Sequence, residues 1–335
     1  MEELLRYFPE ELKNLLRQLE LKKEDLTEIR IRKNKPLIFY ENGTEFFLKK
    51  TGTKSLFPAY TKERCEDYLH ESFDTIAYGV GEREFQSIVE KISHFSLYAL
   101  EHELKQGYFT IDGGHRIGVS GEAVMEHDRI KTLRNLTGLN IRVAHQILGT
   151  ADTILPYLYH PERGFCNTMI VSPPACGKTT LLRDLIRQIS DGKAYGEGRK
   201  VGVVDERNEI SSSYMGKIQN DLGIRTDVIW GCKKLDGIQM LIRSMSPEVL
   251  AVDEIAGRKE AEELLTAVRS GCNILFTIHG KEREDVLFRK DLMPLLEGKV
   301  LERMILLSRS GSRFFRKVYD WKGNEEWGEH ILYAE

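Results

Sequence analysis

The stretch Ser172-Pro-Pro-Ala-Cys-Gly-Lys-Thr-Thr180 decides the fold of this chain. It follows the apolar run Thr168–Val171 and precedes the amphipathic run Leu181–Ile189. A strand, a loop with Gly-Lys-Thr and a helix form the order of a phosphate-binding P-loop, in which backbone N–H groups and the helix N-terminus attract a phosphate. The stretch predicts a nucleoside triphosphate held by Ser172, Pro173, Pro174, Ala175, Cys176, Gly177, Lys178, Thr179 and Thr180.

Two residues of this loop have individual predicted roles. Lys178 would reach the β- and γ-phosphates and the Thr179 hydroxyl would ligate Mg²⁺, so the predicted cofactors are ATP and Mg²⁺. The loop departs from the usual G-x-x-x-x-G-K-[ST] pattern, because Ser172 replaces the first glycine and Ala175 stands where many such loops carry another. With Pro173-Pro174, these side chains predict a stiffer loop. A strand–turn–helix that contains Gly-Lys-Thr by coincidence is the alternative interpretation.

The composition indicates a soluble globular protein. The chain has 335 residues, of which 41% are hydrophobic and 30% charged, and its formal net charge is −3. This length fits two domains of ordinary size. The charge balance gives no overall attraction to nucleic acid or to an anionic membrane, so nucleic acid is not favoured as a partner.

The cysteines and the N-terminus favour a cytoplasmic protein. The five cysteines are scattered and form no C-x-x-C pair, which indicates a reducing compartment: Cys65, Cys166, Cys176, Cys232 and Cys272. The acidic N-terminus lacks the order of a signal peptide, and no apolar run approaches the roughly 20 residues that span a bilayer. We expect no direct membrane insertion, so that membrane association would depend on a partner or a surface patch.

The first part of the chain, residues 1–148, predicts a smaller α+β domain. In Leu26–Arg32, Arg30 and Arg32 alternate with isoleucines, which is typical of a half-exposed strand. The other expected elements are helices over 1–21 and in most of 61–105, a hairpin over 37–48 that turns at Asn42-Gly43, a second hairpin over 108–120, and a strand over 139–143. A linker is expected over 149–165.

Strands and helices alternate over much of residues 166–335. Continuous apolar runs at 169–171, 201–204, 249–252 and 273–278 are typical of parallel strands buried on both faces, and helices are expected at 178–190, 234–245 and 258–270. The prediction is a P-loop NTPase core of the RecA/AAA type with a mostly parallel sheet and a C-terminal β-hairpin extension near 309–313. Its ligand would bind at the carboxyl ends of the strands.

Carboxylates follow two of these strands. After Val249–Val252, Asp253 would approach Mg²⁺, and Glu254 would orient or deprotonate the attacking water. After the strand at 201–204 come Asp205, Glu206 and Glu209, which would lie beside Mg²⁺ or the γ-phosphate. The predicted metal ligands are thus Thr179, Asp253, Asp205 and Glu206. Ordinary strand ends with solvated loop charges are the alternative.

Other polar candidates are Thr277 and His279 at the end of the fourth strand, and several arginines. Thr277 or His279 would hydrogen-bond the γ-phosphate or the attacking water. Phosphoryl transfer also needs further positive charge. The candidates are Arg225 and Arg243, together with Arg116, Arg134 and Arg142 of the first domain, each of which alone fits a surface residue equally well.

These residues resemble motifs of the secretion ATPases of the type II, type IV and pilus-retraction class. Asp205–Glu209 resembles their Asp box, Thr277–His279 resembles their His box, and Asp253–Ala261 is similar to the segment after their second acidic strand. Arg243 resembles an arginine before that strand, and Arg142 resembles their linker arginine. Within this superfamily the chain is most similar to the stage III sporulation protein AA family, over nearly its whole length.

The resemblance implies a hexameric ATPase with each nucleotide between one P-loop domain and arginines of a first domain. It would power a secretion-like channel from mother cell to forespore during endospore formation. It would lie at the membrane on the mother-cell side and dock on an integral membrane platform protein. The chain departs from the class at Asp253-Glu254, where Gly-Glu is usual, at Ala256, near which the class has an arginine, and in its Asp box. The general base is therefore open between Glu254 and carboxylates such as Glu209.

Two other functions remain compatible with the sequence. Arg30 and Arg32 suit a nucleic-acid-stimulated motor related to helicases, although a solvated strand face explains them as well. The atypical loop at Ser172 and Ala175 suits a scaffold that binds nucleotide without turnover.

Overall fold

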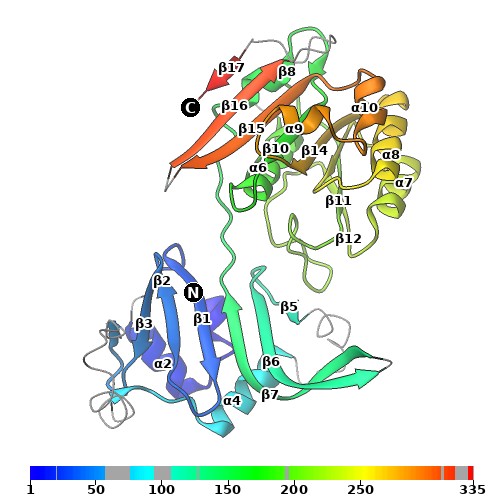
Figure 1. Cartoon of the computed structure of the whole chain (residues 1–335). Coiled ribbons are helices and arrows are strands. Elements are labelled where there is room, and N and C mark those ends of the chain that lie inside the picture. The colour runs from blue at the N-terminus through cyan, green and yellow to red at the C-terminus, as the bar shows by residue number, and fades with distance from the viewer. Residues whose placement is uncertain are drawn as a thin grey trace. The chain divides into compact units, whose positions relative to one another are not determined.

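The computed structural model describes residues 1–19, 21–56, 76–93, 107–126, 128–192, 196–310, 313–320 and 331–334 (Figure 1). The chain forms two compact units. Unit 1 comprises Met1–His145 with Tyr214–Gln219, and unit 2 comprises Gln146–Ser213 with Asn220–Glu335. Cys65 and most of the helical region expected at 61–105 lie outside the described residues.

Unit 1 is built on an antiparallel sheet. Its strand order is β4 (Lys54–Leu56), β3 (Thr44–Leu48), β2 (Ile38–Glu41), β1 (Leu26–Arg32), β7 (Arg129–Arg142), β6 (Arg116–Glu126) and β5 (Tyr108–Thr110). Every neighbouring pair in this order is antiparallel. The described helices are α1 (Glu2–Leu5), α2 (Glu10–Gln18) and α4 (Glu82–Ile92).

The two faces of this sheet differ in chemistry. Ile29 of β1 packs in one hydrophobic cluster with Leu12 of α2 and Ile88 of α4, and all three are buried. Burial of such side chains stabilises a fold by about 1.5–3 kcal/mol each. Successive strand side chains point to opposite faces, so Arg30 and Arg32 lie on the face away from this cluster. One face of the unit 1 sheet is therefore apolar and covered by helices, and the opposite face of β1 is polar.

Unit 2 is built on a sheet that is mostly parallel. Its strand order is β12 (Thr226–Trp230), β11 (Val201–Asp205), β13 (Val249–Val252), β14 (Asn273–His279), β10 (Thr168–Ser172), β15 (Arg303–Ser310), β16 (Arg313–Asp320) and β17 (Ile331–Ala334). The pairs from β12 through β15 are parallel, whereas β16 and β17 add antiparallel strands at one edge. A short 3-10 turn, Leu155–Leu158, leads into the small hairpin of β8 (Tyr159–His160) and β9 (Gly164–Phe165).

Helices cover both faces of this sheet (Figure 1). The helix α6 (Lys178–Asp191) packs with strand residues such as Ile170 on one face. The helices α7 (Lys234–Ser244), α8 (Arg258–Arg269) and α10 (Met293–Glu297) pack with residues such as Met169 on the other, and α9 (Glu284–Leu287) follows β14. Both faces are apolar, which explains the continuous apolar runs in the sequence. Polar groups of the central strands are thus confined to the strand ends.

Several elements differ from the sequence expectation. The single helix expected over 1–21 is divided into α1 and α2, because Pro9 takes an extended ψ of 151° as the residue before α2. Strand β12 was not expected, since its partly exposed residues lack a continuous apolar run. The expected C-terminal hairpin is present as β15 and β16, and β15 also pairs with β10. No helix among the described residues has the length and apolar character needed to cross a bilayer.

Candidate active site

The candidate site lies at the carboxyl ends of four adjacent strands of unit 2. In the sheet order β11, β13, β14 and β10, these ends lead into Asp205, Asp253, His279 and Ser172, respectively. Ser172 and His279 are direct register partners across β10 and β14. Parallel strands place their carboxyl ends at one edge of the sheet, and ligands of such folds bind there. The topology therefore brings the loop and the three polar strand ends together.

The loop after β10 has the backbone geometry of an anion cradle. Gly177, the residue before α6, is left-handed with φ 82° and ψ 16°, and a Cβ there would meet nothing within 4 Å. Ala175 is also left-handed, with φ 60°, which strains a residue that carries a Cβ. Cys176 is 8% exposed and packs in the α6 core cluster, so its side chain is a core group. Ser172 donates from its hydroxyl to the carbonyl oxygen of Pro173 at 2.8 Å.

The first residues of α6 contact the acidic end of β13. The Lys178 ammonium lies 3.4 Å from Asp253 Oδ1 and 3.8 Å from Glu254 Oε2. The Thr179 hydroxyl donates to Asp253 Oδ2 at 3.3 Å. The cation, the hydroxyl and the carboxylates thus form one cluster. A triphosphate would compete with the carboxylates for Lys178.

Thr277 connects β14 to both carboxylate residues. Its hydroxyl, which is fully buried, donates to Asp253 Oδ1 at 2.6 Å and accepts from the Glu254 backbone N–H at 2.9 Å. The hydroxyl therefore uses its donor and an acceptor lone pair within the protein. The hydroxyl thus fixes the orientation of Asp253, and its expected contact with the γ-phosphate or the attacking water stays a prediction.

Glu254 has the most contacts with charged side chains in this cluster. His279 Nε2 lies 3.2 Å from Glu254 Oε1, and Arg207 donates to Glu254 Oε2 at 3.5 Å. Glu254 also has a left-handed backbone, with φ 53°. Strain of this kind at a residue without a glycine's freedom persists only where its surroundings enforce it, and it gathers at functional sites. His279 remains accessible, with 45% of its side chain exposed.

Asp205 is held within its own loop by four hydrogen bonds. It is 1% exposed and accepts hydrogen bonds from the backbone N–H groups of Glu209, Ile210 and Ser211 at 2.8, 3.1 and 2.8 Å, and from the Ser211 hydroxyl at 2.7 Å. Its oxygens are thereby used within the loop. These bonds make Asp205 an anchor of the loop that carries Glu206, Arg207 and Glu209, and its expected role as a metal ligand stays a prediction.

Asp205 and the remaining acidic residues line a small cavity together with Asp253 and Glu254. Glu206 and Glu209 both line it, and the cavity volume of about 10 Å³ is close to that of one water. The ammonium of Lys234, the first residue of α7, lies 2.9 Å from Glu206 Oε2 and offsets part of the negative charge. Lys234 was not among the sequence candidates, because a lysine that begins a helix gives no motif.

The arginine candidates lie in different places. Arg243 is exposed in the last turn of α7, whose first residue is at the candidate site, so Arg243 lies toward the amino ends of the strands. Arg225 donates to the Ser190 and Asp191 carbonyls at the end of α6 and is a structural residue. In unit 1, Arg134 pairs with Glu122, and Arg142 is exposed. Arg116 lies over the ring of Tyr108, with its guanidinium carbon 5.0 Å from the centroid.

These groups fit a magnesium–triphosphate ligand. Mg²⁺ prefers oxygen ligands and keeps part of its water shell. Thr179 Oγ1 and the Asp253 carboxylate provide such oxygens, and they lie beside the left-handed Gly177 cradle. The Lys178 ammonium supplies the positive charge that phosphate oxygens need.

A family model described as "Sporulation stage III, protein AA" matches residues 59–325. The chain belongs to this family. It is also 38% identical over 326 residues to the stage III sporulation protein AA of Bacillus subtilis (strain 168), covering 97% of this chain and 96% of that protein. Membership of the sporulation stage III AA family thus rests on nearly the whole length of the chain.

Solved structures with a similar fold include those of an ATPase and of a pilus retraction motor. The Legionella pneumophila ATPase DotB has a TM-score of 0.54 at 14% identity, and the match covers 92% of this chain and 80% of that one. The pilus retraction motor PilT with bound ADP has a TM-score of 0.54 at 13% identity, with 88% of this chain and 79% of that one covered. At these identities the likeness establishes an α/β fold that resembles those proteins.

Proposed function

We propose that this chain is a Mg²⁺-dependent ATPase of the secretion-ATPase type, with a P-loop core of the RecA/AAA kind. The observation that carries the proposal is the cluster of Lys178, Thr179, Asp253 and Glu254 at the carboxyl ends of adjacent parallel strands. A cradle for phosphate, an oxygen donor pair for Mg²⁺ and an accessible carboxylate are the parts that phosphoryl transfer to water requires.

Each residue has a distinct role in the proposed reaction. The loop from Ser172 to Thr180 and the Lys178 ammonium bind the triphosphate, and Thr179 and Asp253 would hold Mg²⁺, which would supply further positive charge against the phosphates. Thr277 holds Asp253 in place through its hydroxyl. Glu254 orients the attacking water and accepts its proton. His279, 3.2 Å from Glu254 Oε1, holds that carboxylate in position.

The proposed assembly is a hexamer in which arginines complete the site. Arg142 is exposed, and Arg243 lies at the end of α7 away from the Lys178 cluster. Arg243 would therefore act on the nucleotide of a neighbouring subunit, and Arg142 would supply charge from unit 1. The family and the fold likeness support a wider role in which ATP hydrolysis powers a secretion-like channel during endospore formation. The protein would then be cytoplasmic, bound to an integral membrane platform protein on the mother-cell side.

The mass of the particle, measured with and without ATP beside its rate of hydrolysis, tests this proposal. A nucleotide-dependent six-subunit ring with activity is the expected result, and the Lys178→Ala variant should lose both responses to ATP. A monomer that hydrolyses ATP at full rate would contradict the shared site. Tight ATP binding without turnover, even with the partner and membranes present, would instead favour a nucleotide-gated scaffold.

A further inference from the structure

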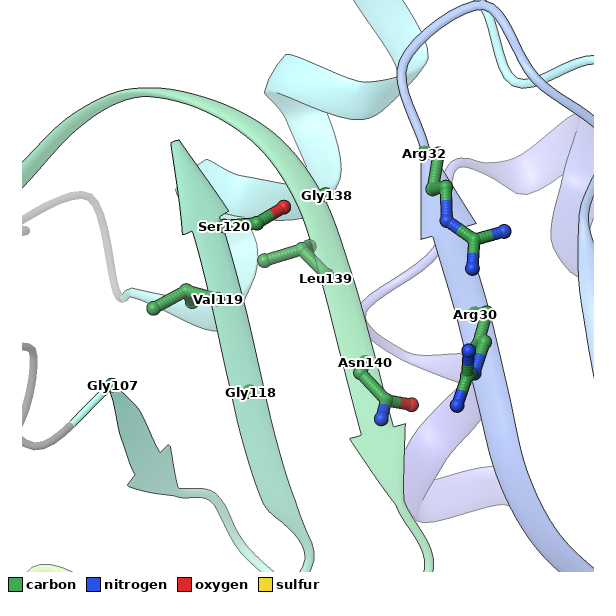
Figure 2. A pocket seen from close by; sticks show the side chains of 9 residues that line it. All are labelled: Arg30, Arg32, Gly107, Gly118, Val119, Ser120, Gly138, Leu139 and Asn140. Atoms are coloured by element: carbon green, nitrogen blue, oxygen red, sulfur yellow. The ribbon is translucent and has the colours of Figure 1, made fainter. Parts of the chain in front are cut away.

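The polar face of the unit 1 sheet contains a hollow that the proposed ATPase site does not use (Figure 2). Its volume is about 270 Å³, and its lining includes Arg30 and Arg32 of β1, Asn140 and Gly138 of β7, and Gly118 of β6. The register explains this grouping, because Arg30 pairs with Asn140, which pairs with Gly118, while Arg32 pairs with Gly138. Residues on three adjacent strands therefore face the same hollow.

The hollow is positively charged. Arg30 is paired with Glu28, and its guanidinium carbon lies 5.4 Å from the centroid of the Tyr40 ring. Arg32 is exposed and has no ion pair or hydrogen bond within the described part of the chain. Glu28 itself does not line the hollow, and neither does any other acidic residue among those described. Two guanidinium groups present planar forks that suit phosphate oxygens.

Asn140 adds a requirement for a hydrogen-bond donor. Its Oδ1 atom is buried and lacks a hydrogen-bond partner in the described residues. An unpaired buried acceptor of this kind is unfavourable, and a ligand that donates a hydrogen bond to it would remove that cost. In Figure 2 the Asn140 amide lies on the side of β7 that faces Arg30. The acceptor and the guanidinium groups are therefore placed to contact one ligand together.

Glycines keep the floor of the hollow open. A Cβ at Gly118 would come no closer than 3.7 Å to Asn140 Cβ, an ordinary contact, so the absence of a side chain there is not forced by crowding. The hollow is slightly smaller than the range of about 300–1,000 Å³ typical of sites for drug-sized ligands. The space suits a small ligand.

We propose that this hollow, here called the Arg30–Arg32 pocket, binds a small phosphate ester that carries a hydroxyl or amino group beside the phosphate. Arg32 and Arg30 contact the phosphate oxygens, and Asn140 Oδ1 accepts a hydrogen bond from the neighbouring group. The pocket is lined by unit 1 residues alone, so the proposal does not depend on ATP hydrolysis in unit 2. The ester could be a free metabolite or the headgroup of a phospholipid.

Calorimetric titration of the full chain tests this pocket, with Lys178→Ala present in every sample to remove binding at the P-loop. The probes are inorganic phosphate, glycerol 3-phosphate, adenosine 5′-monophosphate, and vesicles that contain phosphatidylglycerol, whose headgroup carries hydroxyls beside the phosphate. We expect at least one ester probe to bind more tightly than inorganic phosphate. Preference for the soluble esters assigns a metabolite as the source, and preference for the vesicles assigns a headgroup.

Three variants and a control locate the binding. Arg32→Gln should weaken the preferred ester at least about tenfold, and Gly118→Val should weaken it similarly by filling the hollow without changing charge. Asn140→Leu should reduce binding of the ester but leave inorganic phosphate unchanged. Arg83→Gln removes an exposed charge from α4 of the same unit and should have no effect.

The proposal fails if Arg83→Gln weakens binding as much as Arg32→Gln does, because binding would then follow net charge alone. It also fails if Gly118→Val leaves the affinity unchanged, or if no ester probe binds more tightly than inorganic phosphate. Arg32 is exposed, so its variant should fold, and thermal unfolding of each variant checks this.

Discussion

The two sheets of this protein place their polar residues in different locations. The unit 2 sheet is covered by helices on both faces, and the charged groups of its central strands lie at or directly after the carboxyl ends of β11, β13 and β14, beside the loop that follows β10. The unit 1 sheet has helices on one face, and its arginines lie on the other. Coverage of a sheet thus determines where a ligand can reach it. A sheet covered on both faces can bind a ligand at the ends of its strands, whereas a sheet covered on one face can bind a ligand on the other face.

The largest expected effect comes from removing the cation at the unit 2 edge. Lys178→Ala should lower ATP turnover by at least about 10²-fold, because the lost charge stabilises the transferring phosphoryl group. Lys200→Ala is the matched control, since Lys200 is exposed before the first residue of β11, at the opposite edge of the sheet. Steady-state phosphate release measures both. An equal loss of ATP turnover in the two variants would show that hydrolysis does not depend specifically on the cation at the carboxyl ends of the strands.

Replacing each of two glutamates at the same edge by glutamine distinguishes their roles in the reaction. Glu254→Gln should reduce turnover by about 10²–10⁴-fold with nucleotide binding retained, because a general base is lost. Glu209→Gln should have a smaller effect, since Glu254 lies beside Lys178 and His279. Single-turnover kinetics and nucleotide titration measure the two variants. A larger loss in Glu209→Gln would assign the base to the loop after β11.

Acid should lower the free energy of unfolding of unit 1. Burial, with Lys23 nearby, lowers the pKa of His115 to about 4, although Glu3 opposes the shift, and His145 is a further neighbour. The unfolded chain therefore binds more protons between about pH 4 and 6.5, so stability rises with pH across this window and is lost as pH falls through it. The expected change is on the order of 2–3 kcal/mol.

Hydrogen exchange of the two units at pH 4.5 and 7 measures this effect. His115→Asn should flatten the pH dependence of unit 1, because Asn does not titrate and its oxygen can replace His115 Nδ1 as acceptor for the Ala144 N–H. An unchanged slope in that variant would assign the acid sensitivity to other groups.

The buried hydroxyl at the edge should matter for both stability and activity. Thr277→Val leaves Asp253 Oδ1 and the Glu254 N–H without this partner, which should cost about 1–3 kcal/mol. Turnover should fall by about tenfold as Asp253 loses its orientation. Thr277→Ser keeps the hydroxyl and should restore most of both. Thermal unfolding and turnover are the measurements, and full activity in Thr277→Val would remove the positioning role.

The smallest expected effect is at the strained loop. Ala175→Gly should stabilise unit 2 by less than about 1 kcal/mol, since relief of about 1–2 kcal/mol of left-handed strain is partly offset by the freedom of glycine in the unfolded chain. Ala256→Gly, at an exposed residue whose φ is not positive, should destabilise instead. Denaturant unfolding compares the two. A faster turnover in Ala175→Gly would also indicate that this loop limits the rate.

The sequence predicted the unit 2 strands where apolar runs were continuous. The runs expected at 201–204 and 249–252 form β11 (Val201–Asp205) and β13 (Val249–Val252), because strands enclosed on both faces leave an unmistakable apolar pattern. The edge strand β12 (Thr226–Trp230) was missed, since its partly exposed side chains have no such pattern. Continuous burial is thus the feature that makes a strand predictable from a single sequence.

The candidate site was predictable to the level of strand ends but not of individual contacts. Asp253 and Glu254 could be anticipated because they directly follow an apolar strand. The hydrogen bonds that occupy Asp205 could not, since their donors are mostly backbone groups whose direction depends on the loop conformation. Lys234 could not either, because its distance from Glu206 depends on how α7 packs. Which residues fulfil the predicted catalytic roles stays a prediction.

The hydrogen bonds to Asp205 have a consequence for solvent exchange. The N–H groups of Glu209, Ile210 and Ser211 lie in a loop, yet each donates to a carboxylate that is 1% exposed. They should therefore exchange with deuterium as slowly as amides in a helix, and they should exchange quickly once the loop opens. Deuterium exchange at these three amides, measured by mass spectrometry, would therefore report when the loop opens. Such measurements could time the opening of the loop within a nucleotide cycle.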